Sequence, residues 1–146
     1  MDVITQVRCT GALLFVLFVL NFWLPRWFDW RTELPRISRV NEQIVRSHAA
    51  FIALMILLMS AMCLLLAEDL MQPTRLARSI LGGLTLFWFL RLLAQWVLYD
   101  WSLWRGHGTK TFAQIVATLI WLAVTATFAH ALWTNLSGPT ARAFAL

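Results

Sequence analysis

Residues 47–67 read SHAAFIALMILLMSAMCLLLA, an apolar run without a single Asp, Glu, Lys or Arg. At a rise of ~1.5 Å per residue, a helix of this length covers the ~30 Å hydrocarbon layer of a bilayer. A lone strand in lipid would leave its backbone N–H and C=O groups unpaired, so the run has to be helical. The stretch therefore predicts a transmembrane helix.

Three more apolar runs lie on either side of this one. They cover residues 9–28, 77–99 and 111–136, and each is long enough to cross a bilayer as a helix. Four spans are too few for a closed barrel. We therefore predict an all-α polytopic membrane protein, in which residues 1–146 form a single domain. Its four transmembrane helices should pack as an antiparallel bundle.

The composition excludes other classes of protein. The chain is 60% apolar and 13% charged, whereas soluble domains have about 45–50% apolar and about 25% charged residues. The same figures exclude a disordered chain, a collagen-like fibre and a disulfide scaffold. Cys9 and Cys63 lie in or beside apolar runs without metal-ligand spacing, so we expect buried, inert thiols.

The connection between the first two spans predicts a short amphipathic segment over residues 35–46. Its apolar residues Ile37, Val40 and Ile44 recur at three- and four-residue steps, which place them on one helix face. Glu42 and Arg46 are spaced for an ion pair along that helix. The segment either rides on the membrane surface or extends the second transmembrane helix.

Local signals mark the ends of the helices. Pro73 suits the first turn of the third helix, and Thr111 with Gln114 fits a capping box at the start of the fourth. Gly138 followed by Pro139 suits the end of the fourth helix.

The basic residues predict the orientation in the membrane. Seven of them lie on the side of loops 29–46 and 100–110, against four on the side of the termini. The positive-inside rule places these loops in the cytoplasm and both termini outside. We expect an integral protein of a bacterial inner membrane. The net charge of +5 is expected to meet anionic lipid headgroups, not nucleic acid.

Arg91 is the foremost candidate for a functional residue, because a charge inside a span is costly. Trp88, Gln95 and Tyr99 share its helix face by spacing. Candidates at similar depth elsewhere are Asn21, His48 and Asp100, and the set predicts a polar vestibule open to the cytoplasm. The alternatives are structural: Arg91 bonds backbone carbonyls or a lipid phosphate, and His48 and Asp100 are ordinary boundary residues.

Other polar residues in the spans have simpler structural uses. The hydroxyls of Ser60, Thr85 and Thr125 can bond their own helix backbone, and Gln114 is explained by capping. His130 is expected to donate a hydrogen bond between helices.

Small residues spaced four apart predict close helix packing in lipid. These patterns comprise Ser79 and Gly83; Ala49 and Ala53; and Ala123, Thr127 and Ala131.

No cofactor is predicted. His48, His107 and His130 do not form a pair at matching depth for haem, metal-binding motifs are lacking, and the only lysine, Lys110, lies in a loop. Nine Trp and ten Phe residues would suit a pigment, a quinone or a lipid, although such residues more often simply pack.

Two classes of function remain, and an enzyme is disfavoured because no catalytic constellation stands out. The first is a non-catalytic subunit or scaffold that binds lipid or a partner protein, within a homo-oligomer or a larger membrane complex. The second is a small carrier, channel or lipid- or ligand-binding protein that uses the vestibule around Arg91.

Overall fold

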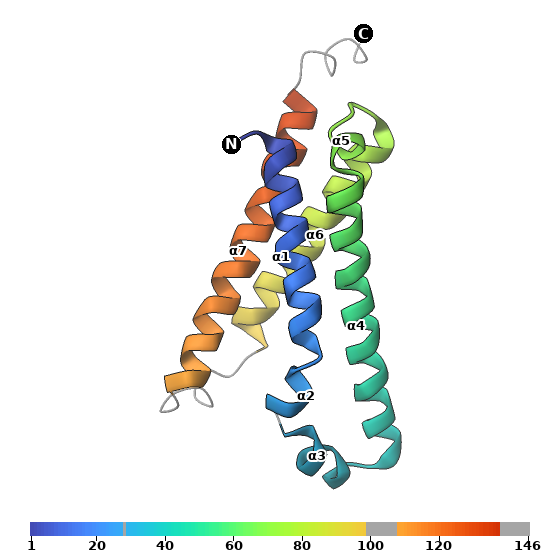
Figure 1. The fold of residues 1–146 in the computed structure, drawn as a ribbon, viewed down its shortest axis with the longest axis vertical. Helices are drawn as coiled ribbons and strands as arrows, with labels where there is room; N and C mark the ends of the chain where they lie inside the picture. The colour runs from blue at the N-terminus through green and yellow to red at the C-terminus, as the bar shows by residue number, and fades with distance from the viewer. Residues whose placement is uncertain (28, 99–107, 138–146) are drawn as a thin grey trace. The chain divides into compact units, whose positions relative to one another are not determined.

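The computed structural model describes residues 1–27, 29–98 and 108–137, with the side chains of 108–110 excepted. Every regular element in this part of the chain is a helix (Figure 1). In chain order the elements are α1 (Val3–Asn21), α2 (Leu24–Trp27), α3 (Trp30–Glu33), η1 (Leu34–Arg36), α4 (Arg39–Leu65), α5 (Ala67–Leu70), α6 (Arg75–Val97) and α7 (Gly108–Ser137).

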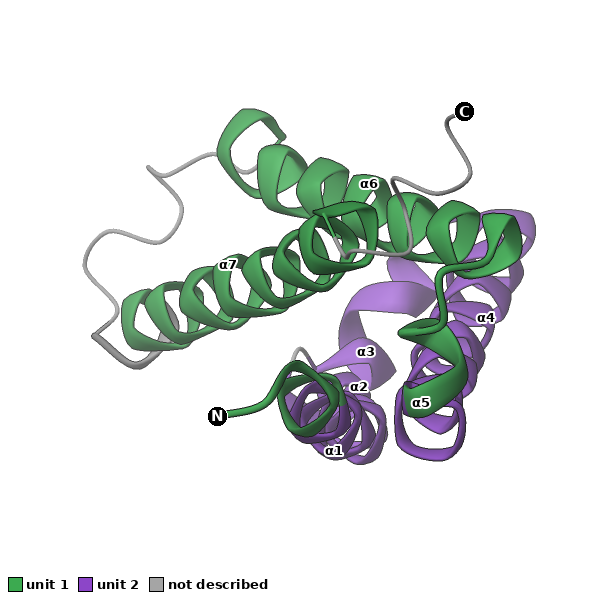
Figure 2. Ribbon diagram, turned by 90° about the horizontal axis from the view of Figure 1, so that it is seen from above, with its two compact units in different colours: residues 1–7, 68–146 green, residues 8–67 purple. Residues whose placement is uncertain are grey.

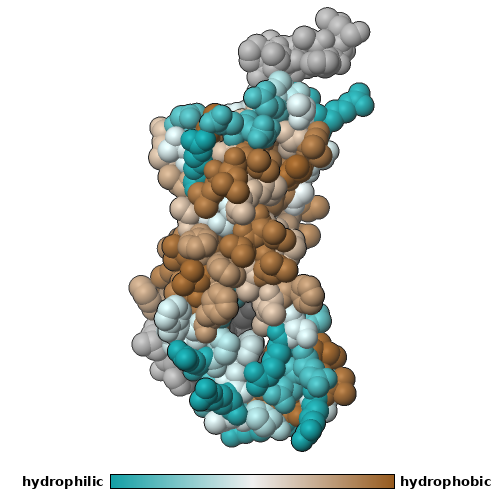
Figure 3. All heavy atoms as spheres, turned by 45° about the vertical axis from the view of Figure 1, so that its right-hand side comes forward, coloured by the Kyte–Doolittle hydropathy of each residue, from teal (hydrophilic) through white to brown (hydrophobic). Residues whose placement is uncertain are grey.

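Helices α1, α4, α6 and α7 are long and apolar enough to cross a membrane, which confirms the prediction of four helices that could span one. Apolar residues gather over the middle of the helices and polar residues near their ends (Figure 3). This distribution matches a hydrocarbon layer bounded by two polar interfaces.

Helix α1 differs at both ends from the expected span over residues 9–28. It begins at Val3, after Asp2, whose carboxylate accepts a hydrogen bond from the backbone N–H of Ile4 (3.4 Å). It ends at Asn21. In a continuing helix the N–H of residue 25 would donate to the Asn21 carbonyl, but residue 25 is Pro and has no N–H. The chain therefore continues in two short helices, α2 and α3.

Helix α4 begins at Arg39 rather than near Ser47, and the Ser38 hydroxyl caps it by accepting from the N–H of Asn41 (3.4 Å). Residues 39–46 of the expected amphipathic segment are thus continuous with the apolar part of α4. The predicted ion pair between Glu42 and Arg46 is confirmed, with N and O 2.9 Å apart.

Two of the predicted helix starts were wrong. Thr74 is the N-cap of α6 and accepts from the N–H of Ala77 (3.1 Å), so Pro73 lies before the cap. Helix α7 begins at Gly108, so Thr111 lies within its first turn and is not its N-cap. Helix α7 extends to Ser137, and the predicted stop at Gly138 and Pro139 lies outside the described residues.

The chain divides into two compact units (Figure 2). Unit 1 comprises residues 1–7 and 68–146, and unit 2 comprises residues 8–67. Unit 1 therefore holds α5, α6, α7 and the first residues of α1, and unit 2 holds the rest of α1 together with α2, α3, η1 and α4.

In unit 2, α1 and α4 approach closely at Gly11. A Cβ atom at this position would lie 2.9 Å from Cys63 Cβ and 2.9 Å from Leu64 Cγ. The Ser60 hydroxyl donates to the Gly11 carbonyl across the same contact (2.8 Å, buried). The expectation that Ser60 bonds its own helix was wrong, because the missing side chain of Gly11 brings another carbonyl within reach. Thr85 and Thr125 do bond their own helices, as predicted.

In unit 1, α6 packs along α7. Arg78 of α6 contacts Asn135 of α7, and Trp88 contacts Trp121. Residue numbers rise along one helix as they fall along the other, so the two helices are antiparallel. His130 Nδ1 lies 3.0 Å from Gln6 Oε1 of α1, which is the predicted hydrogen bond between helices.

Candidate functional site

Arg91 lies in the α6–α7 interface of unit 1, with a partner on each helix. Its Nη1 donates to Gln95 Oε1, one turn further along α6 (3.0 Å). Its guanidinium carbon lies 4.8 Å from the centre of the Trp121 ring of α7, which is within the range of a cation–π interaction. The guanidinium therefore has an amide oxygen and an aromatic face as neighbours within the membrane segment.

Two stacked indoles extend this cluster. The rings of Trp88 and Trp121 lie 5.2 Å apart at an interplanar angle of 23°. Trp88 is 1% exposed. The indole nitrogens of both residues are buried, and neither has a hydrogen-bond acceptor among the described residues. A buried N–H without an acceptor is costly, so an acceptor-bearing ligand would find unused donors here.

Gln95 and Gln114 complete the polar part of the α6–α7 interface. Both are buried, at 2% and 5% exposure. The backbone carbonyl of Gln114 accepts from the Thr118 hydroxyl (2.8 Å). We name Trp88, Arg91, Gln95 and Trp121 the Arg91 cluster. All four belong to unit 1.

The other residues of the predicted vestibule are not brought together with Arg91 in one unit. Asn21 and His48 belong to unit 2, and each bonds a carbonyl of its own helix: Asn21 Nδ2 donates to Leu17 (2.8 Å), and His48 Nδ1 lies 2.9 Å from Ile44 O. Tyr99 and Asp100 lie outside the described residues. The vestibule as a whole stays a prediction.

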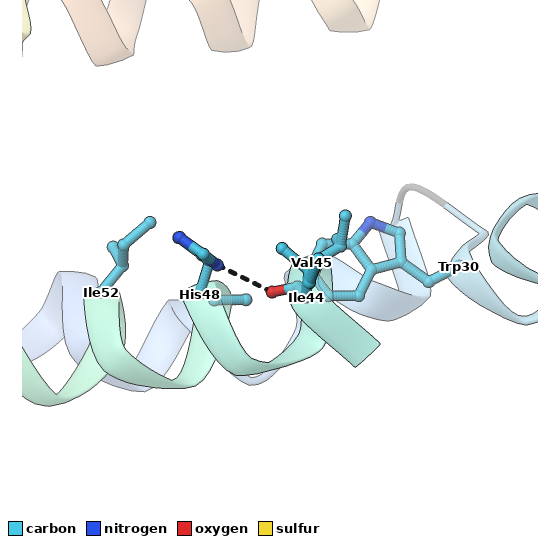
Figure 4. Close-up of a pocket in the computed structure, with 6 residues that line it drawn as sticks. Trp30, Ile44, Val45, His48 and Ile52 are labelled. Carbon is cyan, nitrogen blue, oxygen red and sulfur yellow. Dashed lines mark hydrogen bonds between the residues drawn. The ribbon is translucent and has the colours of Figure 1, made fainter. Parts of the chain in front are cut away.

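His48 lines an apolar groove in unit 2, between α3 and the start of α4 (Figure 4). The groove has a volume of about 350 Å³ and is lined by Trp30, Ile44, Val45, His48, Ala49 and Ile52.

The predicted small-residue patterns have different surroundings. Ser79 and Gly83 of α6 are exposed, and a Cβ atom added to Gly83 would meet no atom within 4 Å. On α7, exposure falls along the pattern, from Ala123, which is exposed, to Ala131, which is buried. Ala49 and Ala53 of α4 are half-buried. The Ser79–Gly83 pattern thus lies on an open face of α6.

Several residues that matter in the structure were not singled out from the sequence. Gly11 lies in an apolar run, where nothing marks its contact with α4. Trp121 is one of nine tryptophans and has no distinguishing spacing. Asn135 near the end of α7 carried a weak signal, as a polar amide in an apolar helix.

Asn135 is 4% exposed and anchors the end of α7. Its Nδ2 donates to the carbonyls of Leu70 (3.1 Å) and Gln72 (2.8 Å), and its Oδ1 accepts from Arg78 Nε (3.2 Å). The side-chain amide therefore has a partner at each polar atom, which indicates a structural role.

Among the described residues, no group of three or more His, Cys, Asp or Glu side chains could hold a metal ion. No protein-family model matches the chain, and no similar curated protein or solved structure was found.

Proposed function

We propose that this protein is a non-catalytic membrane subunit that associates with a second helical membrane chain through the open face of α6. The proposal includes an antiparallel four-helix bundle, with loops 29–46 and 100–110 in the cytoplasm and both termini outside. A second copy of this chain is the simplest partner. Lipid covers the remaining apolar surface.

The observation that carries this proposal is the empty space beside Gly83. Burying apolar surface gives little drive for association in lipid, where helices associate through close backbone packing at small residues. Gly83 has such a surface: Ser79, one turn before it, is exposed, and no atom of the described residues lies within 4 Å of a Cβ at position 83. The backbone of a partner helix could approach there.

The test is the mass and the chain composition of the protein purified in mild detergent. We expect the wild type to run as a dimer or to bring a second chain with it, and Gly83→Leu to lose that partner. Gly82→Leu is the matched control, because Gly82 also has open space around it. Gly82 lies about 100° from Gly83 around the axis of the same helix. Equal masses for all three proteins would contradict the proposal.

A second candidate function is the binding of a lipid or small ligand at the Arg91 cluster. The two unpaired indole N–H groups of Trp88 and Trp121 favour it. Arg91 beside them provides a planar guanidinium that suits a phosphate or carboxylate. The same site would serve a carrier or channel if copies assembled around it.

This second candidate predicts different results for two conservative variants. Arg91→Lys should reduce the content of bound ligand, because an ammonium cannot copy the two-pronged guanidinium. Trp121→Phe should also reduce it, because the ring remains but the N–H donor is lost. Native mass spectrometry of the purified protein measures the bound ligand. Unchanged ligand content in both variants would leave Arg91 a packing residue.

A further inference from the structure

The groove beside His48 combines apolar walls with two polar ring groups, the His48 imidazole and the indole N–H of Trp30. Ile44, Val45, Ala49 and Ile52 of α4 supply aliphatic side chains, and Trp30 of α3 supplies an indole. In Figure 4, His48 and Trp30 flank Ile44 and Val45. None of the six described residues that line the groove is an Asp, Glu, Lys or Arg.

The hydrogen bond of His48 determines which of its nitrogens can accept. Nδ1 lies 2.9 Å from the carbonyl oxygen of Ile44. That oxygen can only accept, so Nδ1 must carry the proton. In a neutral imidazole the other nitrogen, Nε2, is then an acceptor. Figure 4 shows Nε2 directed away from this carbonyl, on the side of Ile52.

The position of the groove along α4 places it at the boundary between headgroups and hydrocarbon. The first turns of α4 carry Arg39 and the ion pair of Glu42 with Arg46, which belong in the polar layer. The apolar window begins beyond them, and His48 lies about 13 Å along the helix from Arg39. A ligand reaching this groove from the bilayer would have its polar head at His48 and its tail in the hydrocarbon.

We propose that this groove binds the headgroup of a quinol, the reduced form of a membrane quinone. One quinol hydroxyl donates to His48 Nε2. The planar ring lies against the apolar wall and the Trp30 indole, and the apolar tail runs past Ile52 into the bilayer. The proposal concerns binding alone and involves no electron transfer.

The same chemistry disfavours quinones, phospholipid headgroups and bare acyl chains. A quinone has carbonyl oxygens in place of hydroxyls, so it can accept from the Trp30 indole N–H but sets its lone pairs against that of His48 Nε2. A phospholipid headgroup brings phosphate acceptors to a groove that has no cation among its described lining residues. Arg46, one turn from the groove, is paired with Glu42. A bare acyl chain would leave Nε2 without a donor.

Calorimetric titration of the protein in nanodiscs tests the proposal. The probes are a benzoquinol with a decyl tail, kept reduced without oxygen, and the matching benzoquinone. We expect the quinol to bind about five- to tenfold more tightly than the quinone, the effect of about one hydrogen bond.

Variants test whether His48 causes the difference in affinity between the quinol and the quinone. His48→Phe should weaken quinol binding to the level of the quinone, and His48→Gln, whose amide oxygen can accept, should restore part of it. His130→Phe is the matched control, because His130 bonds Gln6 in unit 1, and both affinities should stay unchanged. If His48→Phe fails to fold, Ala49→Leu fills the groove and should weaken quinol binding.

Three results would overturn the proposal. One is equal affinity of the wild type for quinol and quinone. The second is a quinol preference that persists in a folded His48→Phe protein, or quinol binding by Ala49→Leu that is as tight as that of the wild type. The third is tighter binding of decyl phosphate than of the quinol, which would assign the groove to a phospholipid headgroup.

Discussion

The Ser60 hydroxyl donates a buried hydrogen bond of 2.8 Å to the carbonyl oxygen of Gly11. This bond joins α4 to α1 at the point where the two backbones approach closely for lack of a side chain on Gly11. Gly83 on α6 is the opposite case, because no atom of the described residues lies within 4 Å of a Cβ added there. One glycine therefore serves the fold of unit 2, and the other has open space beside it.

Gly11→Ala should destabilise the protein, whereas Gly83→Ala should not. A Cβ at Gly11 would come within 2.9 Å of Cys63 Cβ, and overpacking of this kind typically costs about 1–3 kcal/mol. Gly83→Ala meets no atom and gains helix propensity, by up to about 1 kcal/mol. Thermal unfolding in mild detergent, followed by circular dichroism, measures both. Equal unfolding temperatures for the two variants would contradict the close approach of α1 and α4.

Ser60→Ala should lower the free energy of unfolding by about 0.6 kcal/mol, the average for hydrogen bonds between transmembrane helices, and by at most about 1.7 kcal/mol. Ser79→Ala is the matched control, because Ser79 is exposed on α6. Loss of the Ser79 hydroxyl should change the free energy of unfolding by less than about 0.5 kcal/mol. Denaturant titration in a fixed detergent gives both values. A Ser60→Ala protein as stable as the control would show that the hydroxyl adds nothing to the contact.

Asn135→Leu should destabilise unit 1 by about 2 kcal/mol or more, because it removes three hydrogen bonds and leaves buried polar groups without partners. Those partners are the carbonyls of Leu70 and Gln72 and the guanidinium of Arg78. Asn21→Leu is the control, since Asn21 bonds only a carbonyl of its own helix. The same denaturant titration measures the free energy of unfolding of both variants. If both substitutions cost equally little, Asn135 does not anchor α7.

Reporter fusions test the proposed orientation in the membrane. We expect a reporter that works only in the cytoplasm to be active when inserted at Gly106 and inactive when fused after Leu146, because seven basic residues lie on the loop side and four on the side of the termini. Activity at Leu146 and none at Gly106 would reverse the orientation.

The helical class and the four spans were predictable from the sequence because hydropathy over about 20 residues depends on composition alone. The helix ends were less predictable. Helix α1 begins at Val3 and α4 at Arg39, because polar residues extend a helix beyond the hydrocarbon without changing its hydropathy signal. Pro25 carried the information for the end of α1, but the apolar run continues past it and hid the break.

The candidate site was predictable only along one helix. Spacing on α6 placed Trp88, Arg91 and Gln95 on one face, and the structure has all three in the α6–α7 interface. The contribution of Trp121 depends on the register between two helices, which no local pattern encodes. The close approach at Gly11 depends in the same way on which helix lies opposite.

Energy transfer between copies of the protein in lipid vesicles tests the central claim most directly. The expectation of a buried thiol is confirmed for Cys63 and was wrong for Cys9, which is exposed. Donor and acceptor dyes can therefore be attached at Cys9 of the native chain. We expect transfer in the wild type and in Gly82→Leu to persist when the protein is diluted with lipid, and transfer in Gly83→Leu to fall to the level of random encounters. Transfer at the random level in the wild type, in a preparation that contains no second chain, would contradict a subunit that associates through the Gly83 face of α6.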